Sequence, residues 1–343
     1  MAPKANRACC CLSAHSAGLT GLANGNEVEY YHHDLFGTSK DSRERIMIIV
    51  GLHGGLGNQM FQYAMGRAVA LRHGTTLRFD LRGVEGDAKR AYGLPVWRIA
   101  GQPASRMDVL RMRVLNKLSR ALHPSAPYYK HTVIFERDFR FDSNLLEAKR
   151  DCWLFGYWQS GKYFNAVADQ IRTDFTPANE ISSASRAVER EILASGNRSV
   201  FMHIRRGDYL QEPHAQAHGG CSVGYYLRAA DLIAQQVPDP CFFAFSDDPE
   251  WVRDNLHLPY RTTIVSHNKP GDASNVGSEH EDLWLMSRCR HAVLANSSFS
   301  WWGAWLNRES ERIVIAPSRW FGTLGHDTSD LIPAEWIRMG EIG

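Results

Sequence analysis

Two adjacent arginines end an apolar run near the middle of the sequence, in the heptapeptide HIRRGDY, His203–Tyr209. The preceding segment, Ser199–Ile204, predicts a short buried strand. Alternation along a strand places His203 and Arg205 on one face and Arg206 on the other. A guanidinium stays charged at any working pH and presents a flat set of donors that matches phosphate oxygens. The pair therefore predicts a site for a diphosphate, such as a leaving nucleoside diphosphate.

The residues around this pair have both chemical and structural interpretations. Asp208 and Glu212 follow closely enough to be candidate general bases for an acceptor proton. Asp208 is equally suited to a structural ion pair with Arg206. His203 either contacts the nucleotide beside Arg205 or is a structural histidine. We expect Arg205 to be catalytic, because a charged side chain ending an apolar strand is rarely buried without a partner.

Two other predicted strand-to-helix junctions carry polar residues, and ligands of open α/β sheets bind at such carboxyl edges. One carboxylate of the pair Asp247 and Asp248 is explained by helix capping, and the other is open to guanine or ribose. Asn296, Ser297 and Ser298 combine polar side chains with the free N–H groups of a helix start. We expect phosphate contact there, with capping alone as the alternative.

A glycine-rich loop follows the first predicted strand, Arg45–Gly51, and leads into a helix. Its spacing matches neither the dinucleotide fingerprint nor the P-loop. Gly55 and Gly57 let backbone amides approach a ligand closely, and Asn58 and Gln59 add polar side chains. We assign these residues to donor binding, with a tight turn before a packed helix as the alternative.

Glu281 and Asp282 open another predicted helix and are candidates for ribose or base recognition. Favourable electrostatics at a helix amino terminus are a sufficient structural alternative. The chain contains no Asp-x-Asp pair, which is the usual carboxylate clamp for a divalent ion on a nucleotide sugar. We therefore assign no metal and no cofactor.

Three segments together resemble a known family. They are GGLGNQMFQYAMGRAVA (Gly54–Ala70), HIRRGDY, and EDLWLMSRCRHAVLANSSFSWWGAWL (Glu281–Leu306). In this order and spacing they look like the α-1,2-fucosyltransferases of glycosyltransferase family 11, of the bacterial type. The resemblance covers nearly everything after about residue 46.

The resemblance implies an α/β, GT-B-like fold with two Rossmann-like domains facing a central cleft. It also implies metal-independent, inverting transfer of L-fucose from the co-substrate GDP-β-L-fucose to the 2-hydroxyl of a terminal galactoside. The acceptor is then a galactose-terminated oligosaccharide or lipid-linked glycan. Arg205, with Arg206 or Ser298, would stabilise charge on the β-phosphate. The rival functions are α-1,6- or protein O-fucosyl transfer and non-catalytic binding of a GDP-sugar or glycan.

Composition fits this organisation. A chain of 343 residues, 44% hydrophobic and 22% charged, is long enough for two cores. We expect a disordered or poorly packed extension over residues 1–45, an amino-terminal Rossmann-like acceptor-side domain over 46–180 and a carboxyl-terminal GDP-fucose-binding domain over 181–343. A polar, proline-containing stretch, Thr176–Val188, marks the boundary. Short strands are predicted in LPVWRIA (Leu94–Ala100) and TVIFERDFRFD (Thr132–Asp142).

Charge and cysteine content limit the partners. A net charge of +2 disfavours a nucleic-acid partner. An odd count of seven cysteines without a CxxC pair fits a reducing compartment, and no apolar run has the length of a membrane span. We expect a cytoplasmic protein, soluble or peripheral at the inner face of a membrane.

Two segments have surface or packing alternatives. Arg106–Arg120 predicts a basic amphipathic helix with an apolar side made by Met107, Leu110, Val114 and Leu118. It is either an ordinary surface helix or a contact for anionic lipid or an acidic acceptor. The aromatic run FGYWQSGKYF contains three side chains that could form a wall for the acceptor sugar: Tyr157, Trp158 and Tyr163. Packing in the core is the alternative for them.

Overall fold

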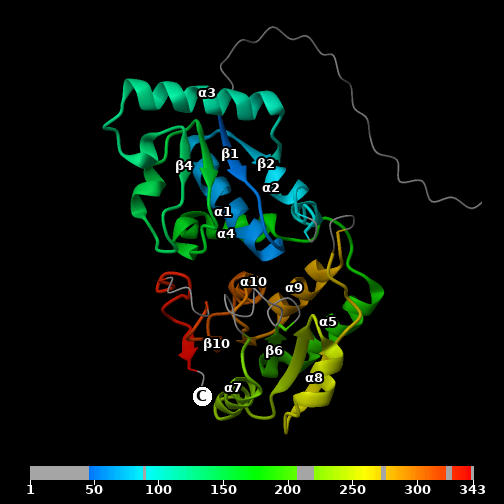
Figure 1. The fold of residues 1–343 in the computed structure, drawn as a ribbon. Coiled ribbons are helices and arrows are strands. Elements are labelled where there is room, and N and C mark those ends of the chain that lie inside the picture. Colours follow the sequence, from blue (N-terminus) through cyan, green and yellow to red (C-terminus); the bar gives the residue numbers. More distant parts are fainter. Residues whose placement is uncertain (1–45, 88–89, 207–219, 272–275, 322–326, 341–343) are drawn as a thin grey trace, which may run out of the picture. The chain divides into compact units, whose positions relative to one another are not determined.

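The computed structural model describes residues 46–87, 90–206, 220–271, 276–321 and 327–340, which belong to one compact unit, Arg45–Gly343. The extension predicted over 1–45 lies outside the described residues. The strands form two separate parallel sheets, each flanked by helices (Figure 1). The strands are β1 (Met47–Gly51), β2 (Thr76–Asp80), β3 (Gln102–Pro103), β4 (Val133–Phe135), β5 (Cys152–Phe155), β6 (Ser199–Ile204), β7 (Cys241–Ser246), β8 (Arg261–Val265), β9 (His291–Val293), β10 (Val314–Pro317) and β11 (Ile337–Met339).

Helices or 3-10 turns connect successive strands from β1 to β10 in the described ranges. The α-helices are α1 (Leu56–His73), α2 (Arg82–Glu85), α3 (Arg106–Leu122), α4 (Ala168–Asp174), α5 (Ser183–Ser195), α7 (Val223–Ala234), α8 (Pro249–Asn255), α9 (Glu279–Arg288) and α10 (Ser298–Leu306). Short 3-10 helices are η1 (Leu94–Val96), η2 (Tyr128–Lys130), η3 (Ser143–Glu147), η4 (Gly161–Tyr163), η5 (Asn165–Val167) and η6 (Gly196–Arg198). None of the helices in the described ranges is both long and apolar enough to span a bilayer.

The first sheet has the strand order β3-β2-β1-β5-β4. Every residue of the central strand β1 is buried, as expected for a parallel strand covered on both faces. Because side chains alternate along a strand, Ile48 and Val50 belong to the large core that contains α1. Met47 and Ile49 point the other way and join a smaller core with residues of α3. The two helices therefore cover opposite faces of the sheet.

The second sheet has the strand order β11-β10-β9-β6-β7-β8. Strands β6 and β7 of this sheet are paired in a register that places His203 opposite Phe245 and Ile204 opposite Ser246. The next residue of each strand, Arg205 and Asp247, therefore leaves the sheet at the same edge. The strand register alone therefore places Arg205 next to the carboxylate of Asp247.

An aromatic core links elements of the two sheets. Phe61 of α1 lies 4.5 Å from Trp301 and 4.8 Å from Trp302 of α10, measured between ring centroids. The indole N–H of Trp302 donates to the Gly57 carbonyl at 2.9 Å. Both tryptophans therefore pack in the core between the two sheets, and α1 and α10 meet at their first turns.

These observations confirm the expected fold, with two Rossmann-like α/β sheets in a GT-B-like arrangement. The first five strands precede residue 180 and the other six follow it, but the domain boundary itself stays a prediction. The short strand expected in Leu94–Ala100 is wrong, because no strand of the structure lies in this segment. Leu94–Val96 forms a 3-10 turn, in which Pro95, lacking an N–H, needs no partner in a sheet.

Candidate active site

A pocket of about 630 Å³ lies at the carboxyl ends of strands from both sheets. Its volume is in the range of small-molecule sites, and such edges are where open α/β sheets bind ligands. The predicted site residues that line it are Gly55, Gly57, Asn58, His203, Arg205, Asp247, Asp282, Asn296, Ser297 and Ser298. These predicted residues come from five separated parts of the sequence.

Arg205 is held in the pocket by a carboxylate. Its Nε lies 3.2 Å from Oδ2 of Asp247, and both side chains are largely buried. The other oxygen of Asp247 accepts a hydrogen bond from the Arg206 backbone N–H at 2.9 Å. The carboxylate thus fixes both the backbone and the guanidinium at the end of β6. A guanidinium that is held in place and permanently charged is suited to bind a phosphate that gains negative charge.

Arg206 points to the other side, as strand alternation predicts. Its guanidinium carbon lies 3.5 Å from the ring centre of Trp251, and its Nε is 4.0 Å from Asp248. Asp248 caps α8 by accepting from the Trp251 backbone N–H at 3.0 Å. Neither Arg206 nor Asp248 lines the pocket. Packing and capping account for both, and their assignment to donor binding stays a prediction without support from their position.

His203 lines the pocket as a neutral side chain. Burial, with a smaller contribution from the charge of Arg205, lowers the pKa of its imidazole to about 3. Its ring lies 5.6 Å from that of Phe299, measured between centroids. At neutral pH it can therefore contribute a hydrogen bond or a packing surface, and no charge.

The glycine loop touches the start of α10. A β-carbon at Gly57 would lie 2.6 Å from the backbone nitrogen of Phe299 and 2.7 Å from the carbonyl carbon of Ser298. Asn58 joins the same contact, because its Oδ1 accepts from the Ser298 hydroxyl at 2.8 Å. It also accepts from the Gln159 amide at 2.9 Å. Only glycine at position 57 permits this approach.

Gln59 turns away from the pocket. Its amide nitrogen donates to the carbonyls of Gly54 and Ala91, each at 2.9 Å, and its oxygen accepts from the Gly93 N–H at 3.0 Å. These bonds use a buried side chain to fix the glycine loop. The expected contact between Gln59 and the donor has no support from this position, and the structural role explains the residue.

The Asn296–Ser298 loop shows the capping that was the alternative to phosphate contact. Ser297 accepts from the Phe299 N–H at 3.3 Å, and Asn296 donates to the Trp320 carbonyl at 3.2 Å. Both nevertheless line the pocket beside the first turn of α10. Capping and phosphate contact are compatible here, because the remaining N–H groups of a helix start are available to an anion.

The two predicted acidic residues of α9, Glu281 and Asp282, differ in whether they line the pocket. Glu281 accepts from the backbone N–H and the hydroxyl of Ser182, at 3.1 and 2.6 Å, and does not line the pocket. Asp282 does line it and accepts from the Asn268 amide at 2.7 Å. Burial, followed by the nearby charges of Glu279 and Glu281, raises the pKa of Asp282 to about 7. Of the predicted pair, only Asp282 is placed to meet a ligand.

Comparison with known proteins identifies the family. The sequence model of glycosyl transferase family 11 matches residues 126–339. The chain belongs to glycosyltransferase family 11. It is 31% identical to the alpha-1,2-colitosyltransferase of Escherichia coli, over 85% of this chain and 99% of that protein. It is 27% identical to galactoside alpha-(1,2)-fucosyltransferase 1 of Aotus nancymaae, over 74% of this chain and 63% of that protein.

Solved structures with a similar fold are more distant. NodZ alpha-1,6-fucosyltransferase, in crystals soaked with GDP-fucose, is 16% identical with a TM-score of 0.40. The match covers 77% of this chain and 93% of that one. A score this low carries no information about function. The family membership expected from the three motifs is confirmed by the sequence comparisons alone.

Several pocket residues of this family 11 glycosyltransferase escaped sequence analysis. Glu279, which lies two residues before the predicted helix start at Glu281, lines the pocket. Burial raises the pKa of its carboxyl, against the opposing charges of Arg90 and Arg205. Arg90, a second cation in the pocket, lies in a loop whose sequence carries no motif. The candidate bases Asp208 and Glu212 lie outside the described residues.

The aromatic segment divides between the pocket and the core. Tyr157 lines the pocket, whereas Trp158 and Tyr163 are buried. Glu136 holds this turn, because its carboxylate accepts from the backbone N–H groups of Tyr157 and Trp158 at 2.6 and 2.9 Å. Core packing therefore explains Trp158 and Tyr163, and Tyr157 remains the candidate for an acceptor wall.

We expect Asp282 to make stability depend on pH. Its pKa of about 7 in the folded protein lies above the ordinary value near 4 in the unfolded chain. Its stabilising contribution is therefore complete below about pH 4 and lost as the pH rises through about 7. The Tm difference between the wild-type protein and Asp282→Asn should change by roughly 5 °C between pH 4 and pH 8.

Scanning calorimetry across this range checks the expectation. The histidines with lowered pKa act in the opposite direction, but they are common to both proteins and cancel in the difference. Glu281→Gln is the comparison of opposite sign, because this carboxyl has a lowered pKa and hydrogen bonds to Ser182, so its stabilising contribution is lost as the pH falls. Parallel Tm profiles for the wild type and Asp282→Asn would contradict the assignment.

Proposed function

We propose that this family 11 glycosyltransferase transfers L-fucose from GDP-β-L-fucose to the 2-hydroxyl of a terminal galactoside, with inversion and without a divalent metal. The observation that carries the proposal is Arg205, fixed by Asp247 in a pocket that also contains the first turns of α1 and α10. Family membership and the α-1,2 linkage named for two relatives support the linkage. The absence of an Asp-x-Asp pair from the sequence supports metal independence.

The transfer is a single displacement. The acceptor hydroxyl attacks C1 of the fucosyl group as the bond from C1 to the β-phosphate oxygen breaks and the ring acquires oxocarbenium character. Negative charge then grows on the diphosphate. Arg205 neutralises it, Ser298 and the backbone N–H groups at the start of α10 add hydrogen bonds, and Arg90 supplies a second cation to the same pocket. Groups fixed before the reaction stabilise this charge without reorganising.

The acceptor proton needs a destination as the new bond forms. The candidates from the sequence are Asp208 and Glu212, which follow the arginine pair. In this proposal one of them accepts the proton, and a strongly dissociative transition state reduces the demand on its basicity. Tyr157 contributes an aromatic surface on which the acceptor sugar can pack.

A second donor is favoured by one comparison. The relative at 31% identity is named a colitosyltransferase, and colitose is L-fucose without its 3-hydroxyl. A pocket that hydrogen-bonds the 3-hydroxyl would reject the deoxy sugar strongly, whereas one that leaves it unbound would accept both. The ratio of kcat/KM for GDP-fucose and its 3-deoxy analogue therefore separates the two donors.

Labelled GDP-fucose and a panel of β-galactosides test the proposal directly. We expect labelled product with an α-1,2 linkage, identified by methylation analysis or NMR, and a rate that changes less than about twofold on adding EDTA. An α-1,6 or protein-linked product would select the rival fucosyltransferases. Tight GDP binding without turnover on any acceptor would select a non-catalytic binding protein, and loss of activity in EDTA would refute metal independence.

A further inference from the structure

Helix α3 exposes the apolar side that the sequence predicted. Its large apolar residues that face solvent recur at spacings of three or four: Met107, Leu110, Val114, Leu118 and Leu122 are between 49% and 71% exposed. We call these five residues the apolar stripe. An ordinary surface helix packs such a stripe onto the core. Here the core contacts come from Val109 and Met112 instead, so the stripe is left in solvent.

The helix is firmly built despite this exposure. Ser105 and Asp108 form a reciprocal capping box at its start. Arg111 forms an ion pair with Asp151, which precedes β5, at 2.7 Å. The Asn116 side chain accepts from the Val133 N–H of β4 at 3.0 Å. These contacts fix the helix on the sheet by one side and leave the apolar stripe facing outward.

Cations lie beside the apolar stripe. Arg106, Arg113, Lys117 and Arg120 are exposed, and their spacing places them together along one flank of the helix. The helix contains a single acid, Asp108, which the capping box uses. An exposed apolar stripe next to a row of cations has the form of a helix that lies in the interface of an anionic bilayer.

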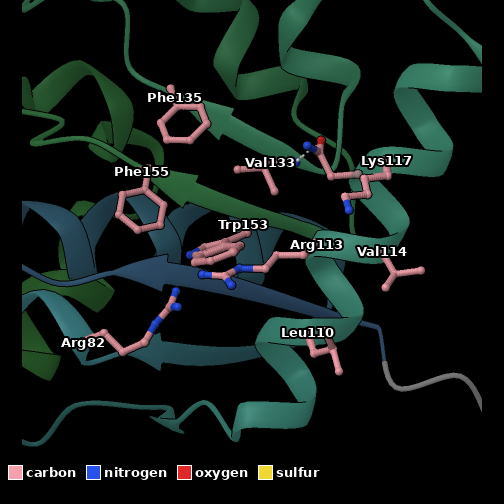
Figure 2. Close-up of a pocket in the computed structure, with 10 residues that line it drawn as sticks. Arg82, Leu110, Arg113, Val114, Lys117, Val133, Phe135, Trp153 and Phe155 are labelled. Atoms are coloured by element: carbon pink, nitrogen blue, oxygen red, sulfur yellow. Dashed lines mark hydrogen bonds between the residues drawn. The ribbon is translucent and has the colours of Figure 1, made fainter.

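A groove continues this surface onto the sheet. It has a volume of about 650 Å³ and lies between α3 and the residues of β4 and β5 that face it (Figure 2). Trp153 forms its floor, with the guanidinium carbons of Arg82 and Arg113 at 5.2 and 5.9 Å from its ring centre. Phe135, at its rim, is 56% exposed. The Arg82 guanidinium is paired with Asp80, to whose two carboxylate oxygens it donates at 2.7 Å each, so the cation that the groove offers is Arg113.

We propose that α3 and this groove form a docking face for an anionic lipid bilayer. The apolar stripe enters the boundary between headgroups and acyl chains, while Arg113, Lys117 and the other flanking cations contact lipid phosphates. Charge complementarity identifies the partner, because a neutral glycan offers no anion to the cations and no apolar surface to the stripe. The groove provides room for one headgroup beside Arg113. Docking is independent of the transfer reaction, so it does not rest on the proposed donor.

Sedimentation with sucrose-loaded vesicles tests the docking face on the full chain. We expect binding to phosphatidylcholine vesicles containing about one third phosphatidylglycerol, much weaker binding to phosphatidylcholine alone, and release at high salt. Val114→Asp combined with Leu118→Asp should lower the partition coefficient at least about tenfold. Arg113→Glu combined with Lys117→Glu should lower it by a similar factor.

Matched controls separate docking from general changes in charge or folding. Leu193→Asp places an acid at another exposed leucine, on α5, and Arg190→Glu with Arg253→Glu makes the same change in net charge away from α3. Both controls should bind vesicles like the wild type, and all variants should keep its Tm. Failure of the wild type to bind anionic vesicles would overturn the proposal. So would equal binding to uncharged vesicles, or equal losses in the control and α3 variants.

Discussion

Arg205→Ala is expected to lower kcat/KM for transfer by about 100- to 1000-fold while leaving the protein folded. The guanidinium is held by Asp247 at the carboxyl end of β6 and lines the pocket, where it would meet charge that develops only as the diphosphate leaves. Removal of one fixed donor to such a charge has effects of this size. Initial rates with labelled GDP-fucose measure the loss, and circular dichroism and Tm check the fold.

Arg206→Ala is the matched control for this prediction. The two arginines are adjacent in sequence, but Arg206 packs on Trp251 and does not line the pocket. Its removal should lower the Tm by a few degrees through the lost cation–π contact and change kcat/KM less than about tenfold. If Arg206→Ala were the more damaging substitution for transfer, or Arg205→Ala retained near-normal turnover, the assignment of the catalytic cation would be wrong.

Gly57→Ala is expected to destabilise the protein by about 2–3 kcal/mol. The added β-carbon would meet backbone atoms of Ser298 and Phe299 at 2.6 to 2.7 Å, and backbone at a helix start cannot rotate away as a side chain can. The first turns of α1 and α10 must therefore separate. Chemical denaturation measures the loss, and a large fall in kcat should accompany it because both turns line the pocket.

Gly55→Ala provides the comparison within the same loop. A β-carbon at Gly55 would find its nearest atoms, in the guanidinium of Arg90, at 3.9 Å, which is an ordinary contact. The backbone there has a φ of −71°, which any residue adopts. We expect its free energy of unfolding to stay within about 0.5 kcal/mol of the wild type. Equal destabilisation by the two substitutions would show that the loop, and not the contact between helices, limits stability.

The parts of the fold that sequence analysis predicted are those with strong local patterns. The strand at Ser199–Ile204 is a continuous apolar run followed by charge, and the structure has it with the same bounds. The segment at Leu94–Val96 is equally apolar, but its proline favours a 3-10 turn over a ladder. The two-residue strand β3 exists only through its pairing with β2, for which the sequence contains no local signal.

The same distinction applies to the site. Residues at the ends of predicted strands, such as Arg205, Asp247 and Ser297, could be assigned to the pocket because parallel strands share a carboxyl edge. Arg90 could not, because it reaches the pocket from an irregular loop. Nor could sequence analysis distinguish Asp282 from Glu281. Which of two adjacent carboxylates faces a ligand depends on whether Ser182, about 100 residues away, occupies one of them.

The contact between α1 and α10 has an electrostatic consequence. Each helix carries roughly half a positive charge at its amino terminus. Their first turns touch through Gly57 and the Ser298 hydroxyl, so two like partial charges face the same pocket at close range. They repel each other until an anion lies between them. In the proposed reaction the diphosphate of the donor neutralises both termini, and it thereby strengthens a contact that the aromatic core and the hydrogen bond from Trp302 to Gly57 already make.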